Sequence, residues 1–216
     1  MHFPRAILWD MDGVLADTSE LHFQSWKPVL VAQGIHFDRE RFHLIYGLKN
    51  EDMLPLLAGR PLEAAWMDRV AEQKEQAFRQ AMPGHLNPLP GVRKWLQQFN
   101  AWGYRQAVAS SAPAENVELV VDVLKIRKYF SALVTPGNLP GKPDPTVFLL
   151  AASQLCVTPQ DCIVIEDSLA GIEAASKAGM HIIAVATTNP PEVLTQADIV
   201  VETLDRLIVE QVETLF

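Results

Sequence analysis

The chain has 216 residues, of which 49% are hydrophobic and 20% are charged, and its formal net charge at pH 7 is -8. This length and composition are typical of a globular protein with a sizeable core, and they exclude a disordered or low-complexity chain. The acidic balance excludes general binding to nucleic acid or to an anionic membrane surface, because both reward clustered lysine and arginine.

The first residues show no signal-peptide pattern, and no stretch approaches the roughly 18 uninterrupted apolar residues of a transmembrane helix. We therefore expect a cytoplasmic protein. We also expect a monomer, with a dimer as the alternative. The two cysteines, Cys156 and Cys162, belong to no Cys-x-x-Cys or Cys/His cluster. We expect both to be buried free thiols.

The first structured stretch is apolar from Ala6 to Trp9 and continues as Asp10-Met11-Asp12-Gly13. The apolar run predicts a strand buried on both faces, with the carboxylates at the edge where open parallel α/β sheets bind ligands. Because side chains alternate along an extended segment, we expect Asp10 and Asp12 to point the same way. By itself the pattern also describes an ordinary turn. A calcium loop fits poorly, because Leu21 stands where a bidentate glutamate is needed.

Only helical patterns follow this strand. Apolar spacing predicts a helix that begins after Asp17 or Thr18, helical sequence over 38–58, and a long helix over 63–82. These patterns predict an all-helical cap of the four-helix type, residues 16–85, inserted after the first strand.

Beyond Pro90, strand and helix patterns alternate as in the βα units of a parallel sheet. The predicted strands are 104–110, 132–135, 162–165, 181–186 and 198–201, and the predicted helices are 92–102, 114–124, 144–155, 170–178 and 204–212. The fold class is therefore α/β, with a Rossmann-like parallel sheet core made of residues 1–15 and 86–216.

Polar side chains gather where the predicted strands end. They are Asp10 and Asp12, Ser110 and Ser111, Lys142 in a loop, and Glu166 and Asp167. Taken singly, they have ordinary explanations as helix caps, a solvated lysine or acids at a helix start. Together they match the needs of a carboxylate that attacks a phosphoryl group: a divalent cation, a hydroxyl, a lysine and an acid for the leaving oxygen.

The motifs at residues 10–14, 108–111, 141–143 and 165–171 resemble those of the haloacid dehalogenase superfamily, in the subgroup of β-phosphoglucomutase and sugar-phosphate phosphatases. The resemblance covers nearly the whole chain. It implies that Asp10 is the nucleophile that forms an aspartyl phosphate and that Asp12 is the general acid and base.

The same resemblance implies which residues hold the phosphate and the metal. Ser110, Ser111 and Lys142 are expected at the phosphate. Mg²⁺ is expected on the Asp10 carboxylate, the Asp12 backbone carbonyl and Asp167, with Glu166 as a direct or water-mediated ligand.

Within the predicted cap, residues 17–26 resemble the β-phosphoglucomutase type. The resemblance implies that His22 lies near the acid/base aspartate and that Lys74 reaches the substrate. Taken alone, His22 indicates a packed or surface histidine, and Lys74, between Glu72 and Glu75, indicates a solvated lysine.

The mutases must also bind a second phosphate, which is not transferred, and this chain lacks most of the residues that they use for it. Asn50 stands where the mutases have an arginine, and Ala112-Pro113-Ala114 replaces polar residues after the serine motif. Losing a bidentate arginine is a large deficit, for which Lys49 or Arg79 would have to compensate. We therefore expect a Mg²⁺-dependent phosphatase that acts on a small phosphorylated metabolite, and a sugar phosphate is the substrate class that we expect first. The alternative is a β-phosphoglucomutase.

An alternative of another class is a phospho-signalling module of the receiver type, or a binding protein without catalysis. Receivers are usually near half this length, and their acids lie on different strands. In this chain Asp10 and Asp12 follow one strand, and every catalytic position is filled.

Overall fold

The structure is a computed structural model that describes residues 4–46 and 48–216. The chain divides into two compact units, one formed by Met1–Asp17 with Asn87–Phe216 and the other by Thr18–Leu86. The boundaries predicted from the sequence, after residues 15 and 85, lie within two residues of these divisions. Among the described residues, none of the helices combines the length and the apolar character that a bilayer span requires.

The larger unit is built on a parallel sheet with the strand order β3-β2-β1-β4-β5-β6. The strands are β1 (Ala6–Trp9), β2 (Arg105–Ala109), β3 (Ala132–Val134), β4 (Cys162–Glu166), β5 (His181–Val185) and β6 (Ile199–Val201). Each strand predicted beyond Pro90 is present, with its ends within one residue of the prediction. The α/β fold is therefore confirmed.

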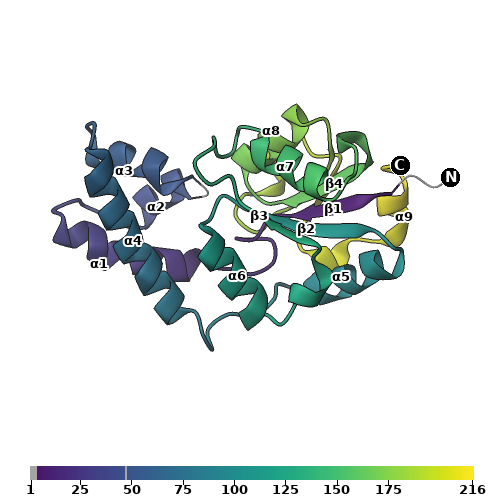
Figure 1. Ribbon diagram of the computed structural model, residues 1–216, viewed down its shortest axis with the longest axis horizontal. Coiled ribbons are helices and arrows are strands. Elements are labelled where there is room, and N and C mark those ends of the chain that lie inside the picture. The colour runs from purple at the N-terminus through teal and green to yellow at the C-terminus, as the bar shows by residue number, and fades with distance from the viewer. Residues whose placement is uncertain (1–3, 47) are drawn as a thin grey trace. The chain divides into compact units, whose positions relative to one another are not determined.

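The central position of β1 sets the place of the site. Figure 1 shows β1 between β2 and β4, and the register aligns Trp9 with Val108 and with Ile165. The chain fills one side of the sheet as far as β3 and then crosses to β4, so the strand order reverses beside β1. Such a reversal is where open α/β sheets bind ligands.

Helices cover both faces of this sheet (Figure 1). They are α5 (Val92–Ala101), α6 (Ala114–Val123), α7 (Thr146–Gln154), α8 (Leu169–Lys177) and α9 (Val209–Glu213), with the short turns η1 (Arg127–Tyr129), η2 (Pro159–Asp161), η3 (Pro191–Val193) and η4 (Leu204–Arg206). The predicted helix over 204–212 is divided into η4 and α9. The Leu204 carbonyl accepts a hydrogen bond of 2.8 Å from Trp95 Nε1, and Leu207 is extended and fully buried.

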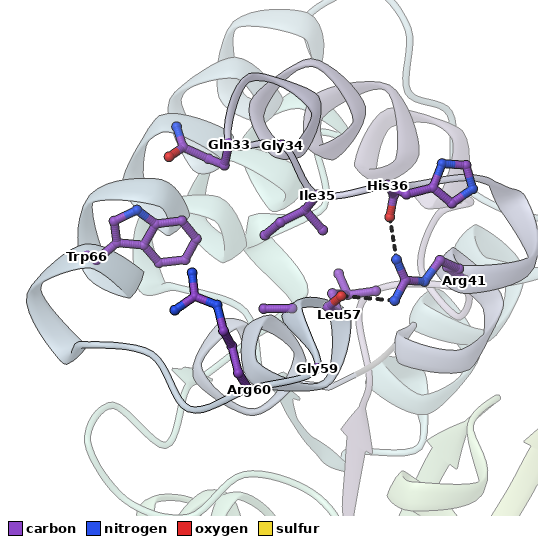
Figure 2. Close-up of a pocket in the computed structure, with 10 residues that line it drawn as sticks. Gln33, Gly34, Ile35, His36, Arg41, Leu57, Gly59, Arg60 and Trp66 are labelled. Carbon is purple, nitrogen blue, oxygen red and sulfur yellow. Dashed lines mark hydrogen bonds between the residues drawn. The ribbon is translucent and has the colours of Figure 1, made fainter.

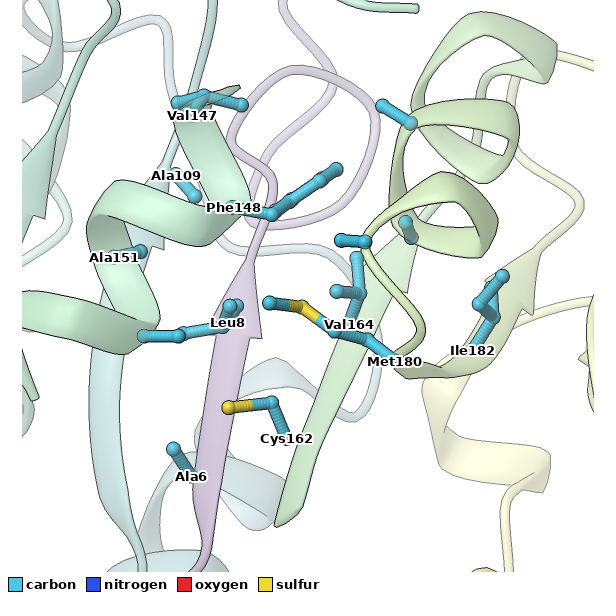
Figure 3. Close-up of a cluster of buried hydrophobic side chains, with 14 of the residues drawn as sticks. Ala6, Leu8, Ala109, Val147, Phe148, Ala151, Cys162, Val164, Met180 and Ile182 are labelled. Carbon is cyan, nitrogen blue, oxygen red and sulfur yellow. The ribbon is translucent and has the colours of Figure 1, made fainter. Parts of the chain in front are cut away.

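The core covers both faces of β1, which explains why all four residues of this strand are apolar. All four of its residues are fully buried, which confirms the prediction of a strand covered on both faces. Figure 3 shows Leu8 and Val164 on the face covered by Phe148 of α7. On the opposite face, Trp9 packs edge-on against Phe99 of α5. Covered faces leave only the strand ends for polar chemistry.

The smaller unit is helical, as the sequence predicts. Its helices are α1 (Ser19–Ala32), α2 (Arg39–Ile45), α3 (Asn50–Ala58) and α4 (Ala64–Ala81). The segment 38–58 forms two helices, because Tyr46 and Lys49 adopt extended backbone conformations between them. The Asp38 carboxylate caps α2 by accepting a hydrogen bond of 2.9 Å from the backbone N–H of Arg41. Phe23, Trp26, Met53 and Val70 are part of the buried cluster that joins the helices.

Candidate active site

Asp10 and Ser110 directly follow the carboxyl ends of two neighbouring strands, β1 and β2. The backbone N–H of Asp10 continues the β1 ladder by donating to the carbonyl of Ile165 at 3.0 Å, and Ser110 does the same with Val134 at 3.1 Å. Both side chains are buried. The chain leaves the strand after Asp10, and Asp12 pairs with Ala16 in an isolated bridge. Asp12 therefore lies beyond the regular part of β1, and the common direction of the Asp10 and Asp12 side chains stays a prediction.

Lys142 is the buried cation of this edge. Its Nζ lies 2.6 Å from Glu166 Oε1, and it also donates a hydrogen bond to Asp10 Oδ1. Burial opposes the charge of Lys142, but the carboxylates of Asp10 and Glu166 raise its pKa above the usual value. Lys142 is therefore a permanent positive charge between two acids.

The start of α8 holds Glu166 in place. Glu166 Oε2 accepts hydrogen bonds from the backbone N–H groups of Asp167 and Ser168, both at 2.7 Å, and from Ser168 Oγ at 3.0 Å. Ser168 also caps α8 by accepting from the Gly171 N–H at 3.0 Å. A methyl group on Gly171 would overlap the Glu166 carboxylate. Glycine is thus the residue that lets the helix approach this acid.

Asp167 is buried between the first motif and the loop after β5. Gly13 has a φ of +80°, and a side chain at this position would overlap the Asp167 carboxylate. Thr188 Oγ1 donates a hydrogen bond to Asp167 Oδ2, and Asn189 Nδ2 donates to the Asp167 backbone carbonyl at 3.0 Å. Sequence reasoning missed Thr188 and Asn189. The signal was available, because they are polar residues just beyond the apolar run 182–186.

Asp10, Glu166 and Asp167 form the acidic cluster of the site. One carboxylate oxygen from each lies within 4.8 Å of the others. Burial raises the pKa of Asp10 to about 8, with Lys142 acting against the rise and Glu166 and Asp12 adding to it. Burial, then Glu166 and Asp10, also raise the pKa of Asp167 well above its usual value. Three buried carboxylates with one ammonium lack positive charge, and an all-oxygen set of this kind suits a hard divalent cation such as Mg²⁺.

The hydroxyl of Ser111 is a second feature of this edge that fits a ligand. Its hydroxyl is buried and has no hydrogen-bond partner among the residues that the structure describes. Buried hydroxyls are normally paired, so an unpaired one beside Ser110 fits a site for an anion that accepts hydrogen bonds.

The smaller unit brings together three of its four predicted residues. Lys74 Nζ lies 2.8 Å from His22 Nδ1 and 2.9 Å from Glu75 Oε1, and Asn50 Nδ2 donates to the same Glu75 oxygen at 2.8 Å. Burial opposes the charge of Glu75, but Lys74 and Asn50 lower its pKa. The fourth residue, Lys49, instead pairs with the exposed Glu51 at 2.9 Å.

Lys74 is not solvated, although its neighbours in sequence suggest it. Only 2% of the residue is exposed, and its ammonium lies over the rings of Trp26 and Phe78. Val70, Lys74 and Phe78 repeat every four residues and are all buried. That spacing was the sequence signal for a buried lysine.

Arg79 was suggested, together with Lys49, as a replacement for the missing phosphate-binding arginine. Its guanidinium pairs with Glu72 at 2.8 Å.

A pocket of about 400 Å³ lies within the smaller unit (Figure 2). Arg41 spans it by donating to the carbonyls of His36 at 2.6 Å and Leu57 at 2.9 Å, while Arg60 and Trp66 line another side. The residues that line it include none of the four predicted in this unit. The pocket is therefore separate from the His22 and Lys74 cluster.

Comparisons with known proteins agree with this architecture. The sequence model of a family described as haloacid dehalogenase-like hydrolase matches residues 7–185. Beta-phosphoglucomutase of Bacillus subtilis is 35% identical over 95% of this chain and 92% of its own length. A phosphorylated carbohydrates phosphatase of Thermotoga maritima is 33% identical over 82% of each chain. The crystal structure of beta-phosphoglucomutase from Clostridium difficile superposes with a TM-score of 0.88, at 26% identity, over 99% of this chain and 97% of that one.

Proposed function

Because the chain belongs to the haloacid dehalogenase-like hydrolases, we propose that it is a Mg²⁺-dependent phosphatase of a small phosphorylated metabolite, first of all a sugar phosphate. The observation that carries the proposal is the buried cluster of Asp10, Lys142, Glu166 and Asp167 at the end of β1. It offers a carboxylate nucleophile, a fixed cation and a set of oxygen ligands at one place. Relatives named as phosphatases and as a phosphoglucomutase support the same chemistry.

In the proposed reaction, the Asp10 carboxylate attacks the phosphorus atom, and the bond from phosphorus to the substrate oxygen breaks. Asp12 gives a proton to the departing oxygen. Asp12 then takes a proton from a water molecule, which attacks the aspartyl phosphate and releases inorganic phosphate while restoring Asp10. Every atom of the phosphoryl group thus passes from substrate to Asp10 and then to water.

The other residues position the phosphoryl group and balance its charge. Ser110, Ser111 and Lys142 donate hydrogen bonds to its oxygens, with the unpaired Ser111 hydroxyl ready to do so. The carboxylates of Asp10 and Asp167 and the backbone carbonyl of Asp12 would hold Mg²⁺, with Glu166 beside them. When bound there, Mg²⁺ would supply positive charge against the charge that builds up on the transferring oxygens.

The second candidate is a β-phosphoglucomutase, which the Bacillus subtilis relative and the His22 and Lys74 pair favour. A mutase binds a second phosphate, and the side chain at the position of the expected arginine is Asn50, which is engaged with Glu75. This engagement favours hydrolysis. We propose that the protein acts as a monomer on a soluble metabolite.

One assay separates the two reactions. The protein is given β-glucose 1-phosphate, Mg²⁺ and a trace of glucose 1,6-bisphosphate, and both glucose 6-phosphate and inorganic phosphate are followed. Phosphate release without glucose 6-phosphate supports a phosphatase, whereas glucose 6-phosphate that forms much faster than phosphate identifies a mutase. A panel of other sugar phosphates then defines the substrate.

Asp10→Asn tests the mechanism common to both reactions. We expect loss of turnover and of phosphoenzyme with the circular dichroism unchanged. Asp122→Asn, on the exposed side of α6, is the matched control and keeps full activity. If Asp10→Asn keeps activity near that of the unmodified protein, Asp10 is not the nucleophile.

A further inference from the structure

Thr188 lies in the loop after β5, directly beside the candidate metal ligand Asp167. Because β5 pairs with β4 in the register Glu166 to Ala184, the segment after Val185 runs past the end of β4. Thr188 Oγ1 donates to Asp167 Oδ2 at that point. A Cβ built on Gly13 would lie 3.0 Å from Thr188 Oγ1, so the loops after β1, β4 and β5 meet around one carboxylate.

Thr188 matters more for the side chain of Asp167 than for that of the neighbouring acid, Glu166. Glu166 Oε2 is held by three donors from the start of α8, and its Oε1 by Lys142. In the part of the chain that the structure describes, Thr188 is the one hydrogen-bond donor to the Asp167 side chain. Without that hydroxyl, the rotation of the Asp167 carboxylate would be limited by packing alone.

Asn189 secures the same loop at a second point. Its amide donates to the Asp167 backbone carbonyl at 3.0 Å, so two consecutive residues grip the side chain and the main chain of Asp167. Oδ2 is occupied by Thr188, which leaves Oδ1 for another partner. A carboxylate that ligates a metal is commonly oriented in this way by a hydrogen bond to its second oxygen.

We propose that Thr188 is a positioning residue for the metal site: its hydroxyl fixes Asp167 so that the free carboxylate oxygen faces the divalent cation. The inference rests on the proposed function only in that it takes Asp167 as a ligand of Mg²⁺. The step that Thr188 affects is cation binding and not the transfer of the phosphoryl group.

Thr188→Val is the direct test, because valine keeps the branched shape and removes the hydroxyl. Mn²⁺ is used as the probe metal, and free Mn²⁺ is measured by electron paramagnetic resonance with no substrate present. We expect the dissociation constant to rise about 10- to 100-fold, the usual effect of losing a partner of a metal ligand. The Mg²⁺ concentration for half-maximal activity should rise by a similar factor, with kcat recovering at high Mg²⁺.

Two further variants show that the hydroxyl is the cause. Thr188→Ser keeps the donor and should bind Mn²⁺ within about threefold of the unmodified protein, a small effect on the scale of these contacts. Thr187→Val makes the same change one position earlier, at an exposed residue, and should leave binding unchanged. Thr188→Ala replaces the valine variant if that variant does not fold, as judged by thermal unfolding in chelator.

The outcomes separate this inference from the proposed function. If the unmodified protein binds Mn²⁺ and Thr188→Val binds it equally well, the positioning role is wrong and the metal site stands. The role is also wrong if Thr188→Ser binds as weakly as Thr188→Val. If the unmodified protein binds no divalent cation at all, both the metal site and the role of Thr188 are wrong.

Discussion

Gly171 in the first turn of α8 packs directly against the carboxylate of Glu166, so closely that a methyl group would overlap both carboxylate oxygens. In an exposed helix interior, replacing glycine by alanine stabilises a protein by about 1 kcal/mol. Because Glu166 holds Lys142, which in turn contacts Asp10, the absence of a side chain at Gly171 bears on the whole acidic cluster.

We therefore expect Gly171→Ala to reverse the usual sign. The overlap should lower the free energy of unfolding by about 1 to 3 kcal/mol, the common range for overpacking. Turnover should fall at least tenfold, on the order of the loss expected when a supporting contact moves. Urea unfolding and phosphatase assays measure the two effects. Ser176→Ala, on the exposed side of α8, is the control and should change neither.

The raised pKa of Asp10 predicts how stability depends on pH in a metal chelator. With a pKa of about 8 in the folded state and 3.8 as its usual value, Asp10 binds a proton more tightly when folded. The free energy of unfolding should therefore fall as pH rises from about 4 to 8, by up to about 1.4 kcal/mol per pH unit for one carboxylate. Lys142, whose pKa is raised above 10.5, stays charged throughout this range.

Mg²⁺ should oppose this loss, because it replaces the proton as the partner of the carboxylates. We expect Mg²⁺ to raise the melting temperature more at pH 8 than at pH 5.5. Asp10→Asn should flatten the pH dependence in chelator. Stability that rises between pH 5 and pH 8 in chelator would contradict the assigned environment of Asp10.

The two cysteines should differ in reactivity. Cys162 is buried, its thiol donates to the Thr158 carbonyl at 3.3 Å, and burial followed by the charge of Asp161 raises its pKa to about 12. Cys156 is exposed, which corrects the expectation that both thiols are buried. Because the thiolate is the reactive form, iodoacetamide at pH 8 should add once to the native protein and twice in guanidinium. Intact mass measures this, and Cys156→Ser should show no native adduct.

Arg41 should stabilise the smaller unit by joining two of its segments. Its guanidinium donates to the backbone carbonyls of His36 and Leu57 across the pocket in Figure 2. Arg41→Met keeps the apolar stem and removes both bonds, so we expect a loss of about 1 to 2 kcal/mol in urea unfolding. Arg60→Met is the matched control, because Arg60 is exposed and lines the same pocket. Equal losses in both variants would show that the two bonds contribute nothing.

The sequence by itself determined the layout of the sheet and most of its carboxyl edge. Apolar runs and their spacing are local properties, and alternating strands and helices force the strands to be parallel, with their carboxyl ends at one edge. Asp10, Ser110, Glu166 and Asp167 are found near one another for that reason. Lys142 was predicted from the order of motifs, and the structure places it between Asp10 and Glu166.

The tertiary structure decided what depends on contacts between distant residues. Lys74 contacts His22, which is 52 positions away in the sequence. Thr188 contacts Asp167, which is 21 positions away. Cys156 is exposed, although its neighbours in the sequence suggested a core position. Local patterns give the direction of a side chain along its own helix or strand, but hydrogen bonds and burial follow from which other segment packs beside it. Only the folded chain brings those segments together.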